Sequence, residues 1–453
     1  MGSSFPAALF YWRRNFATYI LFTFIILFFL VFEHSSFTFR SFKTETIPPS
    51  LQPSSLNLPP QCIDPYRIPG HLLLPPVAPY EEARWFPFYP EHLLGHDGLR
   101  DPANMTDEQK NFIFPPDAVN KPLLNKLIPE NVAYSWSHAL TEYMNLTRTK
   151  QNQNKNLDGD PLTGRQKKRL DFLSKHLRWL QNKRILIFGD SVDRMMDLFL
   201  CSRLGLTGDK HPEQHTVASC HVPDFNFTIT HWHVASMAHE RKEWWWRENM
   251  EYVSFEDRQK HIFQQEVDLV KGIDGRGPDL IIFQSLLWDA LMFELSQESA
   301  YGDNEKNRLP YFSELEYFRD RFHLFIRYIK DLFNDTPMLY RSAIPRRGES
   351  KNSLYVTGLD RMARSVAYHN DIEVFEWWKM VVGFPNMYKD FIHIDQSPLS
   401  SLYSDMMLYY LFRASGGLEI KGKIIAYPSD RPSMSKATRW AECHSYNMIN
   451  INR

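Results

Sequence analysis

A serine that could act as a nucleophile stands where an apolar run ends. Ile185 to Phe188 are β-branched or bulky, Gly189-Asp190-Ser191 follows, and apolar residues then recur near the helical period from Met195 onward. The pattern predicts a buried strand turning into a helix, with Ser191 at the turn. A hydroxyl there lies at the carboxyl end of a sheet, beside helix-start N–H groups that could stabilise an oxyanion. The alternative is that Asp190 or Ser191 merely caps the helix.

A nucleophilic serine needs a base, and the base needs a residue that orients it. The stretch Tyr388-Lys-Asp-Phe-Ile-His-Ile-Asp395 places Asp390 three positions before His393, ahead of a helix predicted over Leu402–Phe412. One short loop can therefore present both the imidazole and the carboxylate that fixes its tautomer. Asp395 is a lesser candidate for the orienting role. The alternative is a surface loop whose His and Asp are only solvated.

The scaffold for these groups is predicted from alternating strand and helix patterns that begin after a polar stretch, residues 148–163, expected to be a surface loop. Residues 62–143 are expected to be irregular structure packed on the domain. Strands are predicted at 184–188, Phe227–Val234, Leu280–Gln284, Met338–Ser342 and Ile372–Phe375, with helices at Leu170–Leu180, Phe318–Phe333 and Tyr355–Tyr368. This alternation predicts βαβ units and a mostly parallel sheet covered on both faces.

The composition sets the class of protein and of partner. The chain has 453 residues, 43% of them hydrophobic and 15% aromatic, which is enough for one large core or two ordinary ones. Its formal net charge is -1 and its pI about 7.0. The chain therefore lacks the basic footprint of a nucleic-acid-binding protein, and neutral substrates fit better.

The N-terminal region predicts a membrane anchor. Residues 16–32 read FATYILFTFIILFFLVF without a charge, Arg13-Arg14 precede them and Glu33 follows. A short span with a basic cytosolic flank is typical of a single-pass type II protein of the early secretory pathway. No small-x-small cleavage pattern supports the rival, a cleaved signal peptide. We expect a cytosolic tail over 1–15, a Pro/Ser-rich stem over 33–60 and a lumenal domain over 61–453.

The cysteines and glycosylation sequons agree with a lumenal domain. An even number of cysteines in an oxidising compartment predicts two disulfides, and closeness in sequence favours Cys201–Cys220, which leaves Cys62 to join Cys443. Four free buried thiols are the alternative. Four asparagines begin an N-x-Thr sequon, namely Asn104, Asn145, Asn226 and Asn334.

The two motifs together resemble those of a known superfamily. Gly189-Asp190-Ser191 early in an α/β domain, with Asp390-x-x-His393 near its end, looks like the GDSL/SGNH hydrolases. The resemblance is closer to the PC-esterase branch, which includes plant trichome-birefringence-like polysaccharide O-acetyltransferases and related fungal and animal membrane-anchored proteins. It covers about residues 165–415 and implies an SGNH-like three-layer α/β sandwich with a mostly parallel sheet. The type II anchor and stem also resemble that branch's layout.

The resemblance implies a role for each matching residue. Ser191 would be the nucleophile, His393 the general base and later acid, and Asp390 the residue that orients His393. Arg194 matches an arginine common in PC-esterases and could help to hold the acyl oxyanion or the turn. Gly189 and Asp190 are further candidates for oxyanion or substrate binding.

A second block after the third predicted strand also matches in part. The stretch Phe283-Gln-Ser-Leu-Leu-Trp-Asp289 resembles the family's Asn-Ser-Gly-x-Trp pattern, which makes Gln284 and Trp288 candidates for oxyanion or substrate binding. Gln284 stands where Asn is usual and Leu286 where Gly is usual, but a glutamine amide can still donate to an oxyanion. No glycine block lies between strands one and three, so one usual oxyanion donor is unassigned.

The expected function is therefore serine-dependent acyl transfer on a glycan, most simply polysaccharide or glycan O-acetylation in the Golgi. Resolution of the acyl-enzyme by water in place of a sugar hydroxyl would make the protein a carbohydrate O-acetylesterase. We expect no bound cofactor or metal, an acetyl ester or thioester as donor and a glycan acceptor; the charge balance predicts no nucleic-acid partner. The oligomeric state is left open.

Other signals point to competing functions. Asp158-Gly-Asp160 is a D-x-D triplet like that of glycosyltransferases that use Mn²⁺ and a nucleotide sugar, although it lies in a turn-forming stretch. His231 and His233 could form a metal pair, but no third ligand is evident. Tryptophans at 244–246, 288 and 377–378 could stack on sugars or simply pack in the core. A carbohydrate-binding protein without catalysis is a further alternative.

Overall fold

The computed structural model describes residues 64–68, 70–73, 83–87, 133–154, 162–206, 217–237, 254–272, 275–301, 309–344, 353–384, 387–390, 392–394, 398–420, 423–428 and 440. The chain divides into two units, Met1–Asn57 and Leu58–Arg453, and every described residue belongs to the second. The predicted tail and anchor and most of the predicted stem fall in the first unit, and all three lie outside the described residues. Among the described helices, none combines the length and the apolar character needed to cross a membrane.

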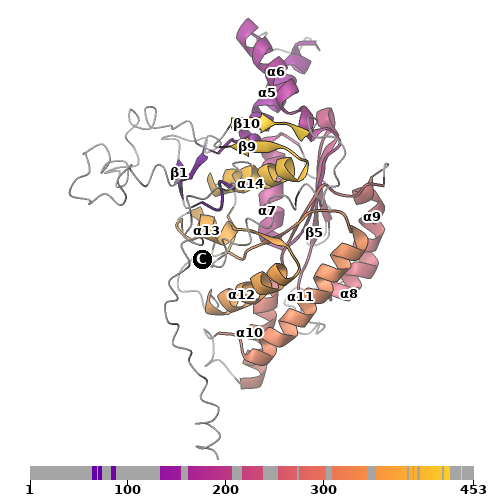
Figure 1. Ribbon diagram of the computed structural model, residues 1–453, viewed down its shortest axis with the longest axis vertical. Helices are drawn as coiled ribbons and strands as arrows, with labels where there is room; N and C mark the ends of the chain where they lie inside the picture. The colour runs from indigo at the N-terminus through magenta and orange to yellow at the C-terminus, as the bar shows by residue number, and fades with distance from the viewer. Residues whose placement is uncertain are drawn as a thin grey trace, which may run out of the picture. The chain divides into compact units, whose positions relative to one another are not determined.

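A six-stranded sheet forms the centre of the described domain (Figure 1). Its order is β4-β5-β3-β6-β7-β8; β4 pairs antiparallel with β5, and the other four pairings are parallel. The strands are β3 (Arg184–Gly189), β4 (Val217–Val222), β5 (Phe227–His233), β6 (Leu280–Phe283), β7 (Met338–Arg341) and β8 (Glu373–Phe375). The predicted α/β fold with a mostly parallel sheet is confirmed.

The connections create a switch point next to β3. From β3 the chain moves to β5 on one side and then crosses to β6 on the other, so that β3 lies between the second and third parallel strands. In open α/β sheets a crevice forms at such a point, outside the carboxyl ends of the strands. The residues that follow β3 therefore lie where a ligand site is expected.

Helices cover both faces of the sheet. The side chain of Phe188 on β3 packs on Phe325 of α11, whereas the adjacent Gly189 faces Asp193 of α7. Because successive strand residues point to opposite faces, α11 and α7 belong to different layers. The helices of the layers are α7 (Ser191–Arg203), α8 (Phe255–Arg258), α9 (Gln264–Lys271), α11 (Phe312–Leu332), α12 (Ser353–His369) and α14 (Pro398–Ala414).

The remaining elements lie around this core (Figure 1). In the described part of the chain they include two short antiparallel pairs and four α-helices: β1 (Gly70–Leu73) with β2 (Arg84–Pro87), β9 (Leu418–Ile420) with β10 (Lys423–Ala426), α5 (Trp136–Asn154), α6 (Gly164–His176), α10 (Leu287–Tyr301) and α13 (Trp377–Val381). A 3₁₀ turn at Arg178–Leu180 follows α6.

Two sequence predictions are wrong in part. The stretch 148–163 was expected to be a loop and 62–143 irregular, yet α5 begins at Trp136 and continues to Asn154, and residues 70–73 pair with 84–87. The first turns of α5 bury Trp136 and Leu140. Once those turns form, extending a helix through Lys, Gln and Arg costs little, even without an apolar period.

The structure contains the predicted disulfide between Cys201 of α7 and Cys220 of β4. Cys62 and Cys443 lie outside the described residues, as does the sequon residue Asn104. The other three sequon asparagines are exposed, namely Asn145, Asn226 and Asn334. Their glycosylation stays a prediction.

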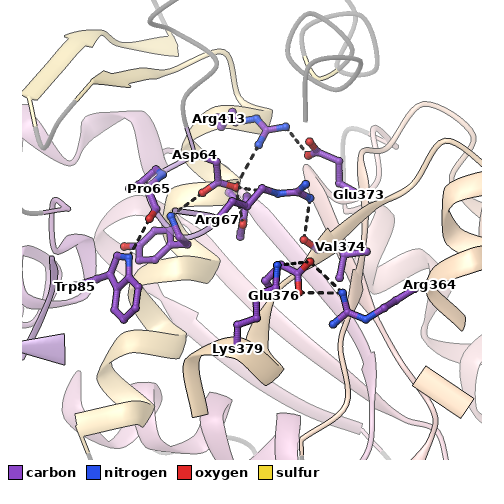
Figure 2. Close-up of polar contacts among 12 residues, drawn as sticks. Asp64, Pro65, Arg67, Trp85, Arg364, Glu373, Val374, Glu376, Lys379 and Arg413 are labelled. Carbon is purple, nitrogen blue, oxygen red and sulfur yellow. Dashed lines mark hydrogen bonds and ion pairs between the residues drawn. The ribbon is translucent and has the colours of Figure 1, made fainter. Parts of the chain in front are cut away.

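A charged cluster attaches the first described residues to the domain (Figure 2). Arg67 donates through Nη2 to the carbonyl of Val374 in β8 at 3.0 Å. Asp64 Oδ2 lies 3.9 Å from Nη1 of Arg413 near the end of α14, and Arg413 also pairs with Glu373 of β8. The segment that precedes β1 is therefore packed against the last parallel strand and the last long helix.

Candidate active site

Ser191 is the first residue of α7, directly after the turn that ends β3. Asp190 is the N-cap residue in extended conformation (φ -93, ψ -165), and its side chain accepts from the N–H of Val192 at 2.9 Å. The Ser191 hydroxyl instead contacts His393, with 2.9 Å between Oγ and Nε2. The capping role thus belongs to Asp190, and the serine is available for chemistry.

The loop around Asp390 presents the imidazole to Ser191. Asp390 Oδ1 accepts the N–H groups of Ile392 and His393 at 2.7 and 2.8 Å, which folds the loop around the carboxylate. Asp390 Oδ2 lies 2.7 Å from His393 Nδ1. One short loop therefore presents both groups, as the spacing predicts. Asp395 lies outside the described residues.

The electrostatics suit a base that faces a serine. Partial burial raises the pKa of the Asp390 carboxyl, but hydrogen bonds from the N–H groups of His393 and Ile392 and from the imidazole outweigh it, so that this pKa is lowered. An ionised Asp390 accepts the Nδ1 proton of His393 and leaves Nε2 to accept from Ser191. Asp390, His393 and Ser191 therefore lie in hydrogen-bonded sequence, an arrangement that suits an orienting carboxylate, a base and a nucleophile.

Gln284, predicted as an oxyanion donor, has its amide inside the protein. It is 1% exposed, and Nε2 donates to Asp193 Oδ2 at 3.1 Å. Gly189 is needed because a Cβ there would lie 2.2 Å from the same Asp193 oxygen. Arg194 is half-buried, which lowers the pKa of its guanidinium. Trp288 is also half-buried, and its ring centroid lies 6.4 Å from that of His233. Binding roles for these residues stay predictions.

Asp289 is a buried residue after β6 that sequence patterns did not single out. Its Oδ1 accepts from Ser236 Oγ at 2.7 Å and from the N–H of Met237 at 2.8 Å, and its Oδ2 accepts from Ser285 Oγ at 2.6 Å. It therefore connects the loop after β5 to the start of α10. The sequence signal that could have pointed to Asp289 is that it is a lone carboxylate in the apolar stretch that contains Trp288.

The competing signals fare differently. Both His231 and His233 are buried in β5 with ring centroids 5.9 Å apart, and burial lowers the pKa of His231 to about 4. Within the described ranges no group of three or more His, Cys, Asp or Glu side chains could hold a metal ion. Trp377 is fully buried in the core and Trp378 partly so. Asp158, Asp160 and the tryptophans at 244–246 lie outside the described residues.

The comparisons with known proteins yield only distant structural likeness. No protein-family model matches the chain, and no curated protein matches it. A putative GDSL-like lipase from Parabacteroides merdae is 9% identical, with 50% of this chain and 95% of that chain covered and a TM-score of 0.29. A GDSL-like lipase from Bacteroides thetaiotaomicron is 12% identical, with 59% and 97% covered and a TM-score of 0.27. Scores this low carry no weight in assigning a function, which has to rest on the site itself.

Proposed function

We propose that this protein is a serine-dependent acyl-transfer enzyme in which Ser191 is the nucleophile. The observation that carries the proposal is the continuous hydrogen-bonded sequence from Asp390 Oδ2 through His393 to Ser191 Oγ, with distances of 2.7 and 2.9 Å. The three residues come from two segments about 200 positions apart. They meet at the sheet's switch point, where α/β proteins bind ligands.

The residues would act in two half-reactions. In the first, His393 Nε2 removes the Ser191 proton while Oγ bonds to the carbonyl carbon of the acyl donor; the bond to the donor's oxygen or sulfur then breaks, and that leaving group takes the proton from His393. In the second, His393 deprotonates an acceptor hydroxyl, whose oxygen bonds to the acyl carbon; the bond between that carbon and Ser191 Oγ then breaks, and Oγ takes the proton from His393. The backbone N–H of Ser191, at the start of α7, is suited to stabilise the oxyanion in both halves.

The acceptor we propose is a sugar hydroxyl of a glycan, which makes the protein a glycan or polysaccharide O-acetyltransferase. The support is the resemblance of the Gly189-Asp190-Ser191 and Asp390-x-x-His393 motifs to the PC-esterase branch, with the anchor-like residues 16–32. We also propose a Golgi membrane location with a lumenal domain. If water is the acceptor, the same site makes a carbohydrate O-acetylesterase.

Two functions of other classes are less well supported. A glycosyltransferase would need Asp158 and Asp160, which lie outside the described residues. A carbohydrate-binding protein without catalysis would have no use for the hydrogen bonds that connect Ser191, His393 and Asp390.

The test is to trap the acyl-enzyme. Full-length protein in detergent is incubated with an activated acetyl ester, and the reaction is quenched in acid. The protein is then digested, and the mass of the peptide that contains Ser191 is measured by mass spectrometry. We expect a mass increase of one acetyl group, which is lost in Ser191→Ala. Adding glycan acceptors then shows whether the acetyl group moves to sugar or to water. An unmodified Ser191 peptide in protein that is folded would refute the proposal.

A further inference from the structure

A buried ion pair lies directly behind the serine turn. Arg341, the last residue of β7, points its guanidinium at Asp193, which stands two positions after Ser191; both side chains are 0% exposed. Nη2 donates a hydrogen bond to Oδ2 at 2.8 Å, and Nε lies 2.6 Å from Oδ1 as part of the ion pair. Nη2 also lies 3.6 Å from Asp190 Oδ1. One rigid guanidinium fork therefore contacts residues on both sides of the serine.

Asp193 receives further donors from other elements. Gln284, just after β6, donates to Oδ2 at 3.1 Å, and Tyr403 of α14 donates its hydroxyl to Oδ1 at 2.9 Å. β6, β7 and α14 thus meet at one carboxylate in the first turn of α7. This contact gives Gln284 a role that does not require contact with substrate.

Stability alone is a weak reason for such a pair. Replacing a buried ion pair with apolar side chains of similar volume is often neutral or stabilising, whereas removing one partner leaves an uncompensated charge. The pair instead orients the serine turn, because its contacts fix the positions of Asp190 and Asp193, between which Ser191 stands. The contacts of Ser191 Oγ with His393 depend on where that turn is held.

We propose that Arg341 and Asp193 are positioning residues, which hold the serine turn so that Ser191 Oγ lies in line with His393 Nε2. The inference rests on the proposed acyl-transfer function and deepens it. Neither residue touches the substrate, and both act through the position of Ser191. The consequence is that they set the rate of acylation and leave substrate affinity unchanged.

The test replaces the pair as a unit. In Arg341→Met/Asp193→Leu both charges of the pair are removed together, so that neither Arg341 nor Asp193 is left buried without the other. Acetylation of Ser191 by the activated ester is followed in single turnovers over a range of ester concentrations. We expect the maximal acylation rate to fall on the order of 10²-fold, because displacements near 1 Å cost that much. The half-saturating concentration should stay within about twofold of the wild-type value.

A matched control separates positioning from general stability. Arg413 and Glu373 form another buried pair, and its residues lie near the end of α14 and at the start of β8 (Figure 2). Arg413→Met/Glu373→Leu should leave the acylation rate near wild type even where the melting temperature changes. A folded Arg341→Met/Asp193→Leu variant that acylates within twofold of wild type would overturn the inference.

A more conservative variant keeps the inference testable if the double variant does not fold. Asp193→Asn keeps the volume but loses the charge and replaces one acceptor oxygen with an amide donor, so we expect a roughly tenfold slower acylation at unchanged half-saturation; a wild-type rate would again count against the pair. Arg341→Lys keeps the positive charge but lacks the planar guanidinium, so we expect it to acylate more slowly than the wild type. If wild-type Ser191 itself is never acetylated, the proposed function fails. If wild type reacts and these variants match it, only this inference fails.

Discussion

Neighbouring residues at the serine turn have separate tasks. Asp190 accepts the N–H of Val192 and so caps α7, while the Ser191 hydroxyl faces His393 at 2.9 Å. A motif of Gly, Asp and Ser before a helix is compatible with capping alone, and the sequence could not decide between the two roles. The contact with His393 of the second motif is what favours chemistry over capping, because a serine needs a base close to the turn.

The Gly189 position tests how tightly the turn is packed. In Gly189→Ala the new Cβ would lie 2.2 Å from Asp193 Oδ2, whose position is fixed by Arg341. We expect the free energy of unfolding to fall by about 1–3 kcal/mol, with slower acylation. Gly164→Ala is the control, since no atom lies within 4 Å of its Cβ. Chemical denaturation measures both, and equal effects would contradict the steric account.

The buried His231 makes stability depend on pH. Burial lowers the pKa of His231 to about 4, whereas an unfolded histidine titrates near ~6.5. Between these values the unfolded chain binds more protons, so the free energy of unfolding falls as the pH drops through this window, by up to about 3 kcal/mol. We expect His231→Asn to lose less stability between neutral and mildly acidic pH in urea titrations. Identical pH slopes for the two proteins would argue against this account.

At the scale of elements, the buried strands were the easiest to predict. β3 and β6 are covered on both faces, so each reads as an unbroken apolar run. β4 escaped notice because it is an antiparallel edge strand of mixed composition, VASCHV. The polar second half of α5 has no apolar period, and only its packed first half shows why a helix forms there.

The candidate site divides in the same way. The serine turn and the Asp390–His393 loop each carry a local pattern, so sequence spacing could find them. The contacts of Arg341 and Asp289 could not be found, because their partners come from other strands and helices and depend on the order of strands in the sheet. Gln284 shows the limit of motif matching, since its position fits the family block while its amide contacts Asp193.

The role of the Asp390 charge can be tested without disrupting the loop that Asp390 holds together. In Asp390→Asn the remaining Oδ1 can still accept the N–H groups of Ile392 and His393. The new amide would however face His393 Nδ1 with a donor, which favours the tautomer that carries its proton on Nε2. We expect acylation of Ser191 to slow by roughly 10³–10⁴-fold with little change in melting temperature. A rate within tenfold of wild type would show that Asp390 does not orient the imidazole.

At the scale of the whole molecule, Arg413 joins the two ends of the described domain. Its guanidinium lies 3.9 Å from Asp64 on one side and 4.0 Å from the ring of Trp440 on the other. Asp64 follows Cys62 by two residues, and Trp440 precedes Cys443 by three. The described residues nearest in sequence to these two cysteines therefore contact the same side chain.

We predict on this basis a disulfide between Cys62 and Cys443, both of which lie outside the described residues. Two and three extended residues reach at most about 7 and 11 Å, so each cysteine can come near Arg413 and hence near the other. Digestion without reduction, followed by mass spectrometry, should yield one linked peptide for this pair and another for Cys201–Cys220, which serves as the internal control. Alkylated, unlinked Cys62 and Cys443 in protein whose Cys201–Cys220 bond is intact would refute it. A linked pair would mean that a covalent bond closes the domain beside Arg413, at the C-terminal end of α14. The loop of Asp390 and His393 precedes the other end of this helix.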